Sequence, residues 1–150
     1  MTMNQNRTSD VVLVAVNDSR AAFAAAKVAV EYCAKVGAQL RAVSVIEASE
    51  LDQHLGDTAA LAQGRELAAS AALNHVVASS SAANVTVSVT TRIGSVAAEI
   101  LAEARESDAV MIVMARVSRP GHALPYVGSQ TLRVLEFATV PVLVVPTYAQ

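Results

Sequence analysis

The residues best suited to chemistry lie between 115 and 129, where the sequence reads A-R-V-S-R-P-G-H-A-L-P-Y-V-G-S. Gly128 and Ser129 stand at the start of a helical pattern, and the free N–H groups and dipole of a helix start favour an anion. Arg116 and Arg119 add positive charge to the same loop. The stretch is therefore a candidate phosphate-binding loop. The alternatives are that the Gly-Ser pair only caps a helix and that the arginines are only solvated.

Other kinds of chemistry find less support in the residue pattern. His54, His75 and His122 fall in three different segments without ligand spacing, which argues against a metal site. No serine lies in a G-x-S-x-G pattern, so a hydrolase nucleophile has no support. The acidic cluster at 47–52 contains paired carboxylates, which can act as acid and base. We interpret it instead as a solvated loop and helix start.

Length and composition favour a single cytoplasmic domain. The 150 residues can bury a core without staples, and the net charge of −2, from 13 acids and 11 bases, gives no basic footprint for nucleic acid. The longest apolar run, Ala109–Ala115, is far shorter than the roughly 20 residues of a membrane span. The single cysteine, Cys33, fits a reducing compartment, and residues 1–10 lack the apolar core of a signal peptide.

Five stretches predict β-strands. Val11–Val16, Val110–Met114 and Val140–Val145 are short, continuous and rich in β-branched residues, which is typical of strands buried on both faces of a parallel sheet. Gln39–Ile46 has a similar but weaker pattern. In Asn84–Arg92 apolar residues alternate with polar ones, which indicates an edge strand with one solvated face.

Four helical patterns separate these strands. They begin after Asp18-Ser19, at about Asp57, at Gly94-Ser95 and at Gly128-Ser129. Gly37 is expected to end the first helix as its C′ residue. The inner stripes of the first two helices are expected to be Ala22, Ala26, Ala29, Cys33 and Val36, then Leu61, Ala68, Ala72 and Val76. Strict alternation of strands and helices predicts an α/β fold with a doubly wound parallel sheet and helices on both faces.

In this order and spacing the chain resembles the universal stress protein family. The markers are V-N-D-S at 16–19, the turn at 94–95, S-D-A-V-M-I-V-M at 107–114 and V-P-V-L-V-V-P at 140–146. The resemblance implies a five-stranded sheet in the order 3-2-1-4-5, like that of the adenine-nucleotide alpha-hydrolases. It also implies one universal stress protein domain over 11–150, after a disordered or extended segment at 1–10.

The nucleotide-binding members of that family carry G-x-x-G, nine residues and then G-[S/T] before the last helix. In this sequence Gly128-Ser129 matches the closing pair, but Ala115 and Ser118 stand at the first two glycines. A β-carbon there is strained by about 1 kcal/mol or more if the position needs a positive φ. If the glycine served only for clearance, the side chain pushes the phosphates outward.

The resemblance also implies a role for each matching residue. Asn17 or Asp18 meets the ribose, although binding members usually have aspartate in place of Asn17. Val45 meets the adenine, or is only a core residue of its strand. Ser118, Gly128 and Ser129 meet the phosphates, with Ala115 beside them. The implied ligand is ATP or another adenine nucleotide, bound weakly, with Mg or Mn carried by its phosphates.

Three functions remain open on this pattern. The first is regulatory or protective nucleotide binding without turnover, and the second is an interaction module of the same family that no longer binds nucleotide. The third is an enzyme, such as a slow ATPase or a flavin-dependent electron carrier. It has the least support, because no base or nucleophile is evident near the loop, and aromatic residues, at 3%, leave little to stack on a flavin.

The last apolar run predicts an interface. Val140–Val145 lies at the edge of the sheet if it pairs only with the preceding strand, and Pro141 and Pro146 are typical of an edge position. An open apolar edge invites pairing with another chain. In the family this strand pairs with its copy, so we expect a homodimer through 140–145. A protein partner of unknown identity is also expected, but neither nucleic acid nor membrane.

Overall fold

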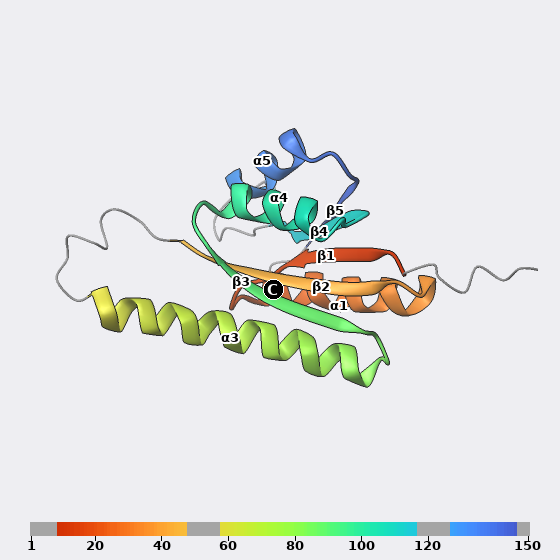
Figure 1. Ribbon diagram of the computed structural model, residues 1–150, viewed down its shortest axis with the longest axis horizontal. Coiled ribbons are helices and arrows are strands. Elements are labelled where there is room, and N and C mark those ends of the chain that lie inside the picture. The colour runs from red at the N-terminus through yellow and green to blue at the C-terminus, as the bar shows by residue number, and fades with distance from the viewer. Residues whose placement is uncertain (1–8, 48–57, 117–126, 147–150) are drawn as a thin grey trace, which may run out of the picture.

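The computed structural model describes residues 9–47, 58–116 and 127–146, in which helices cover both faces of one sheet (Figure 1). The five strands are β1 (Val11–Ala15), β2 (Gln39–Ile46), β3 (Val87–Ile93), β4 (Met111–Ala115) and β5 (Val142–Val145). All pairs are parallel, in the order β3-β2-β1-β4-β5. The expected doubly wound sheet and its strand order are confirmed.

The central strands explain the continuous apolar runs. In β1 and β4 the residues Val12, Leu13, Val14, Ile112 and Val113 are at most 1% exposed, because helices cover both faces of the sheet. β3 lies at the edge, as its alternating pattern predicted, but begins at Val87 rather than at residue 84. Along the predicted apolar stripe, Val85, just before the strand, is 8% exposed, whereas Val89 within it is 39% exposed.

The helices form one layer on each face of the sheet. α1 (Arg20–Val36) and α3 (Thr58–Ala82) lie on one face, and α4 (Val96–Glu106) and α5 (Ser129–Phe137) on the other (Figure 1). The first face is packed mainly with valine and alanine, including Val14, Ala26 and Val76. The second is packed around Leu13, Ile100 and other aliphatic residues. An almost purely aliphatic core therefore fills both layers.

The ends of α1 follow the sequence signals. The Ser19 hydroxyl accepts a hydrogen bond from the Ala22 N–H at 3.1 Å, so it is the N-cap. Gly37 adopts φ 74° and donates its N–H to the Cys33 carbonyl at 2.9 Å, as a C′ glycine does.

In the inner stripes expected for α1 and α3, two residues were assigned wrongly. Val36 is 55% exposed and Leu61 is 44% exposed, although Ala29, Cys33, Ala72 and Val76 are buried. Both exposed residues lie near helix ends. The 25 residues of α3 span about 37 Å at 1.5 Å per residue. The 8 residues of β2 span only about 26 Å. The first turns of α3 therefore extend beyond the sheet (Figure 1).

An ionic cluster holds α4 against β2 and β3. Arg92 donates to Glu99 and Glu103 at 2.7 Å and to Glu106 at 2.8 Å, and Arg41 donates to Glu103 at 2.7 Å. Glu103 is buried, at 4% exposed. The hydrogen bond from Arg92 lowers the pKa of Glu106, and the three carboxylates raise the pKa of Arg92. The cluster therefore ties α4 to the edge strand β3 and to its neighbour β2.

Candidate functional site

The candidate site is a hollow at the carboxyl ends of the strands, where the winding of the sheet reverses between β1 and β4. In a doubly wound sheet this crevice is where ligands bind. The hollow has a volume of about 230 Å³. Its lining comes from β1, β2, β4 and the first turns of α1, α4 and α5, and includes Ala15, Asn17, Ser19, Val43, Val45, Val96, Ile100, Met114, Ala115, Gln130 and Thr131. We call it the cleft.

The inner part of the cleft is aliphatic. Val43 and Val45 come from β2, Val96 and Ile100 from α4, and Met114 from β4. Val45 is half-buried and packs against the core of the α4 and α5 face. Val45 therefore lines the cleft and is also a core residue, and its contact with adenine stays a prediction. A lining of this kind accepts a flat, weakly polar ring by removing apolar surface from water.

Asn17 lies at the mouth of the cleft in the turn between β1 and α1. Its Oδ1 accepts a hydrogen bond from the Ser19 hydroxyl at 2.5 Å, and its carbonyl accepts from the Ser19 N–H at 2.9 Å. The bond to a hydroxyl donor orients the amide, leaving its nitrogen to donate. Asp18 is exposed and lines a neighbouring hollow rather than the cleft. Of the two ribose candidates, only Asn17 lines the cleft.

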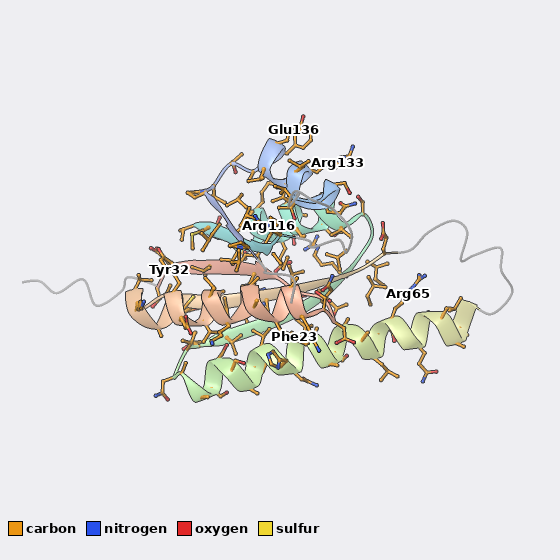
Figure 2. The ribbon with its side chains drawn as sticks, turned by 180° about the vertical axis from the view of Figure 1, so that it is seen from behind. Phe23, Tyr32, Arg65, Arg116, Arg133 and Glu136 are labelled. Carbon is orange, nitrogen blue, oxygen red and sulfur yellow. The ribbon has the colours of Figure 1, made fainter. Side chains whose placement is uncertain are left out.

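The neighbouring hollow lies on the α3 side of the end of β2 and has a volume of about 340 Å³. It shares Asn17 and Val45 with the cleft, so the two hollows adjoin. Arg65, from α3, donates from Nη1 to the Glu47 carbonyl at 2.9 Å and lies on the side of α3 that faces the sheet (Figure 2). Sequence reasoning missed Arg65, because no local signal distinguishes it from a solvated helix residue.

The start of α5 has the geometry of an anion site. Gly128 is its N-cap, with φ 93° and ψ 147° and no side-chain cap bond. A positive φ of this kind favours glycine. Ser129 is exposed as the first helical residue. The Thr131 hydroxyl donates to the Ala115 carbonyl at 3.3 Å and thereby ties α5 to the end of β4.

The predicted phosphate residues are brought together only in part. Gly128 and Ser129 directly precede Gln130, which lines the cleft with Ala115. Ser118 and Arg119 lie outside the described residues. Arg116 directly follows β4 and donates its backbone N–H to the Val145 carbonyl at 2.9 Å, so a cation stands at the end of this strand (Figure 2).

Ala115 is not strained. Among the described residues, positive φ at a residue other than glycine occurs only at Asn84 and Asp108. Ala115 is the last residue of β4, in ordinary extended conformation. A backbone that needs glycine is therefore ruled out at this position, and its methyl group can act only by taking up space in the cleft.

Gln130 is a further cleft residue that sequence reasoning missed. Its Oε1 accepts a hydrogen bond from the Ala97 N–H at 3.1 Å. This bond joins the first turns of α5 and α4, which are 33 residues apart in the chain. Local sequence patterns do not predict a contact between residues so far apart in the chain.

Comparison with known proteins identifies the family. The model of the universal stress protein family matches residues 8–146. The chain belongs to the universal stress protein family. Among curated proteins, none matches the sequence.

Solved universal stress proteins share the fold. One from Burkholderia pseudomallei is 24% identical, with a TM-score of 0.75 over 93% of this chain and 97% of the other. One from Archaeoglobus fulgidus, in complex with dAMP, is 17% identical, with a TM-score of 0.69 over 91% and 97%. A third, in complex with cAMP, is 18% identical, with a TM-score of 0.67 over 93% and 98%.

Metal and thiol chemistry have little basis in the described part of this universal stress protein. Its residues contain no group of three or more His, Cys, Asp or Glu side chains that could hold a metal ion. His75 instead stacks on Phe23, with ring centroids 4.4 Å apart. Burial raises the pKa of the Cys33 thiol to about 11, so this cysteine stays protonated at neutral pH. None of the described helices is long and apolar enough to cross a membrane.

Proposed function

We propose that this universal stress protein binds an adenine nucleotide in the cleft between the ends of β1 and β4. The observation that carries the proposal is the pairing of an aliphatic hollow with a helix start that has no side-chain cap, at Gly128. The hollow suits a purine base, and the open N–H groups of α5 suit a phosphate. Support also comes from two family members of the same fold, solved with cAMP and with dAMP.

Each cleft residue has a distinct role in the proposed complex. Val45 contacts the adenine, and the Asn17 amide hydrogen-bonds a ribose hydroxyl. Gly128 and Ser129 hold a phosphate with their N–H groups and the Ser129 hydroxyl. Ala115 limits how closely the phosphates approach β4, so ATP binds weakly. Ser118, which lies outside the described residues, is proposed to contact the phosphates, and any Mg or Mn arrives with them.

The proposed role is regulatory or protective binding in the cytoplasm rather than turnover. Nucleotide hydrolysis needs a group that orients or deprotonates the attacking water. Among the described residues that line the cleft there is no carboxylate or histidine; Asp18 and Glu47 line the neighbouring hollow instead. A slow ATPase activity would have to rely on positioning alone.

The experiment is direct. Protein purified from cells is denatured, and the supernatant is analysed for released nucleotide. The refolded or nucleotide-free protein is then titrated by calorimetry with AMP, ATP and GTP at physiological magnesium. We expect saturable binding of the adenine nucleotides and weaker binding of GTP. Absence of heat and of released nucleotide would refute the proposal and leave the interaction module as the remaining function.

The second proposal is a homodimer through β5. This strand is the last in the sheet and pairs only with β4 among the described residues. Pro141 and Pro146 flank it, and Leu143 is 38% exposed. An apolar edge of this kind pairs readily with a second strand. The interaction module would act through the same surface, with a second copy or a protein partner. Sedimentation at micromolar concentration tests the dimer.

A further inference from the structure

The side-chain amide of Gln130 is oriented by a hydrogen bond to the first turn of α4. Gln130 is the second residue of α5, and its Oε1 accepts from the Ala97 N–H of α4 at 3.1 Å. A backbone N–H can only donate, so the side chain must present its oxygen to α4. Its side-chain nitrogen, which the bond to Ala97 does not use, then keeps two N–H donors for a ligand.

This bond also decides which helix start is open to an anion. Ser95, the N-cap of α4, makes no side-chain cap bond, and Gln130 satisfies an N–H of that turn instead. Gly128, the N-cap of α5, has no side chain to cap its own helix. A ligand anion therefore finds α4 partly satisfied, and meets the N–H groups of α5 and the Gln130 amide together.

The donors of the Gln130 amide have no acceptor among the residues that the structure describes. Gln130 is half-buried and lines the cleft beside Thr131. A side chain in the first turn of a helix lies within reach of an anion bound at that helix start. These facts together make the amide nitrogen a candidate ligand contact, independently of the residues matched to the family motif.

We infer that Gln130 donates a hydrogen bond from Nε2 to a phosphate oxygen of the bound adenine nucleotide. The inference rests on the proposed nucleotide binding. The Gln130 amide supplies a donor to the phosphate at a place where the Ala115 methyl group keeps the phosphate away from the β4 backbone. Because the amide oxygen is turned toward the Ala97 N–H, the side chain presents its N–H donors to a ligand acceptor such as phosphate.

The test uses Gln130→Glu. A glutamate still accepts from the Ala97 N–H, so the link between α4 and α5 is kept, but it has no donor and repels phosphate. Calorimetry compares AMP with adenosine, which has no phosphate. We expect the Kd for AMP to rise about tenfold or more. The Kd for adenosine should stay within about twofold, because a factor of that size is well under 1 kcal/mol. The charge-matched control is Gln39→Glu, at the end of β2 that lies away from the cleft. It should leave the Kd for AMP and the Kd for adenosine unchanged.

A second measurement uses the wild-type protein, because Gln130→Glu could weaken AMP binding by repelling the phosphate from a distance or by disturbing the fold. In the wild-type protein, the Gln130 side-chain amide signals in a nitrogen–proton NMR spectrum should shift with AMP and not with adenosine. Unchanged AMP affinity in Gln130→Glu, an equal loss for adenosine, or amide signals that ignore AMP would each overturn the inference and leave the proposed function standing. A wild-type protein that binds neither AMP nor adenosine would instead remove the proposed function itself.

Discussion

At the scale of single residues, the proposed phosphate contact depends on the space that Ala115 leaves in the cleft. Its methyl group lines the cleft, but its backbone is ordinary strand, so the departure from the family's glycine affects clearance and not strain. A substitution to glycine therefore opens space without correcting any conformation. Affinity can rise while stability falls, because glycine in a strand costs about 0.5–1 kcal/mol relative to alanine.

We therefore predict opposite effects of Ala115→Gly on binding and on stability. Combined with Ser118→Gly, it should tighten ATP several-fold in a calorimetric titration, while Ala115→Gly alone lowers the free energy of unfolding by about 0.5–1 kcal/mol. Ala34→Gly, at an exposed position of α1, is the control for a general glycine effect and should not change ATP affinity. An unchanged ATP affinity in the double variant would mean that clearance is not the defect.

The sequence predicted those site residues whose position follows from a strand end or a helix start. Asn17, Val45 and Ala115 line the cleft as expected, because the carboxyl ends of parallel strands meet at one edge. Gln130 and Arg65 were missed because their roles depend on contacts to segments 33 and 18 residues away. Such contacts leave no periodic signal in the sequence.

At the scale of elements, sequence patterns located strands better than they assigned helix faces. The bounds of β2 were predicted to the residue although it also carries polar residues, because its buried Leu40, Ala42 and Val43 mark the length that is covered on both faces. The stripe of α3 was wrong at Leu61, because the overhang of a helix depends on the length of the sheet beneath it. The ionic cluster on α4 had no sequence signature, because its members come from β2, β3 and α4.

Within that cluster, Glu103 should matter far more than Glu106. Glu103 is buried and accepts from both Arg41 and Arg92, whereas the Glu106 side chain is 66% exposed. We predict that Glu103→Gln lowers the free energy of unfolding by about 2 kcal/mol, since it weakens charge-assisted bonds in a buried position. Glu106→Gln should change it little, because exposed ion pairs contribute little. Urea denaturation of both variants measures the difference, and equal effects would contradict it.

The effect of Glu106→Gln on the free energy of unfolding should depend on pH in a defined direction. Arg92 lowers the pKa of Glu106 in the folded protein, so this pair stabilises the fold at pH values above the ordinary glutamate pKa of about 4.3. The stabilisation is lost as the pH falls through the lowered folded value. The difference in free energy of unfolding between wild type and Glu106→Gln, measured by urea denaturation, should therefore shrink in acid.

At the scale of the whole molecule, the two sheet edges differ in what they offer to another chain. β3 has a polar face with the ionic cluster, whereas β5 is apolar and flanked by prolines. The carbonyl of Pro141, just before β5, accepts from the Ile112 N–H at 3.0 Å, and that of Val145 accepts from the Arg116 N–H, just after β4, at 2.9 Å. Because backbone groups alternate along a strand, those of Val142 and Val144 point away from β4, toward any second copy.

A proline at residue 144 separates edge pairing from folding. Val144→Pro removes an outward N–H and leaves the bonds to β4 intact. An edge strand tolerates proline at such a position. The matched control is Val89→Pro on β3. There Leu40 donates to the Thr86 carbonyl, and the same alternation turns the N–H of Val89 outward at the opposite edge. If the dimer forms through β5, Val144→Pro sediments as a folded monomer at micromolar concentration, while Val89→Pro and the wild type sediment as dimers. A dimeric Val144→Pro protein would place the interface elsewhere, and a monomeric wild type would exclude the dimer.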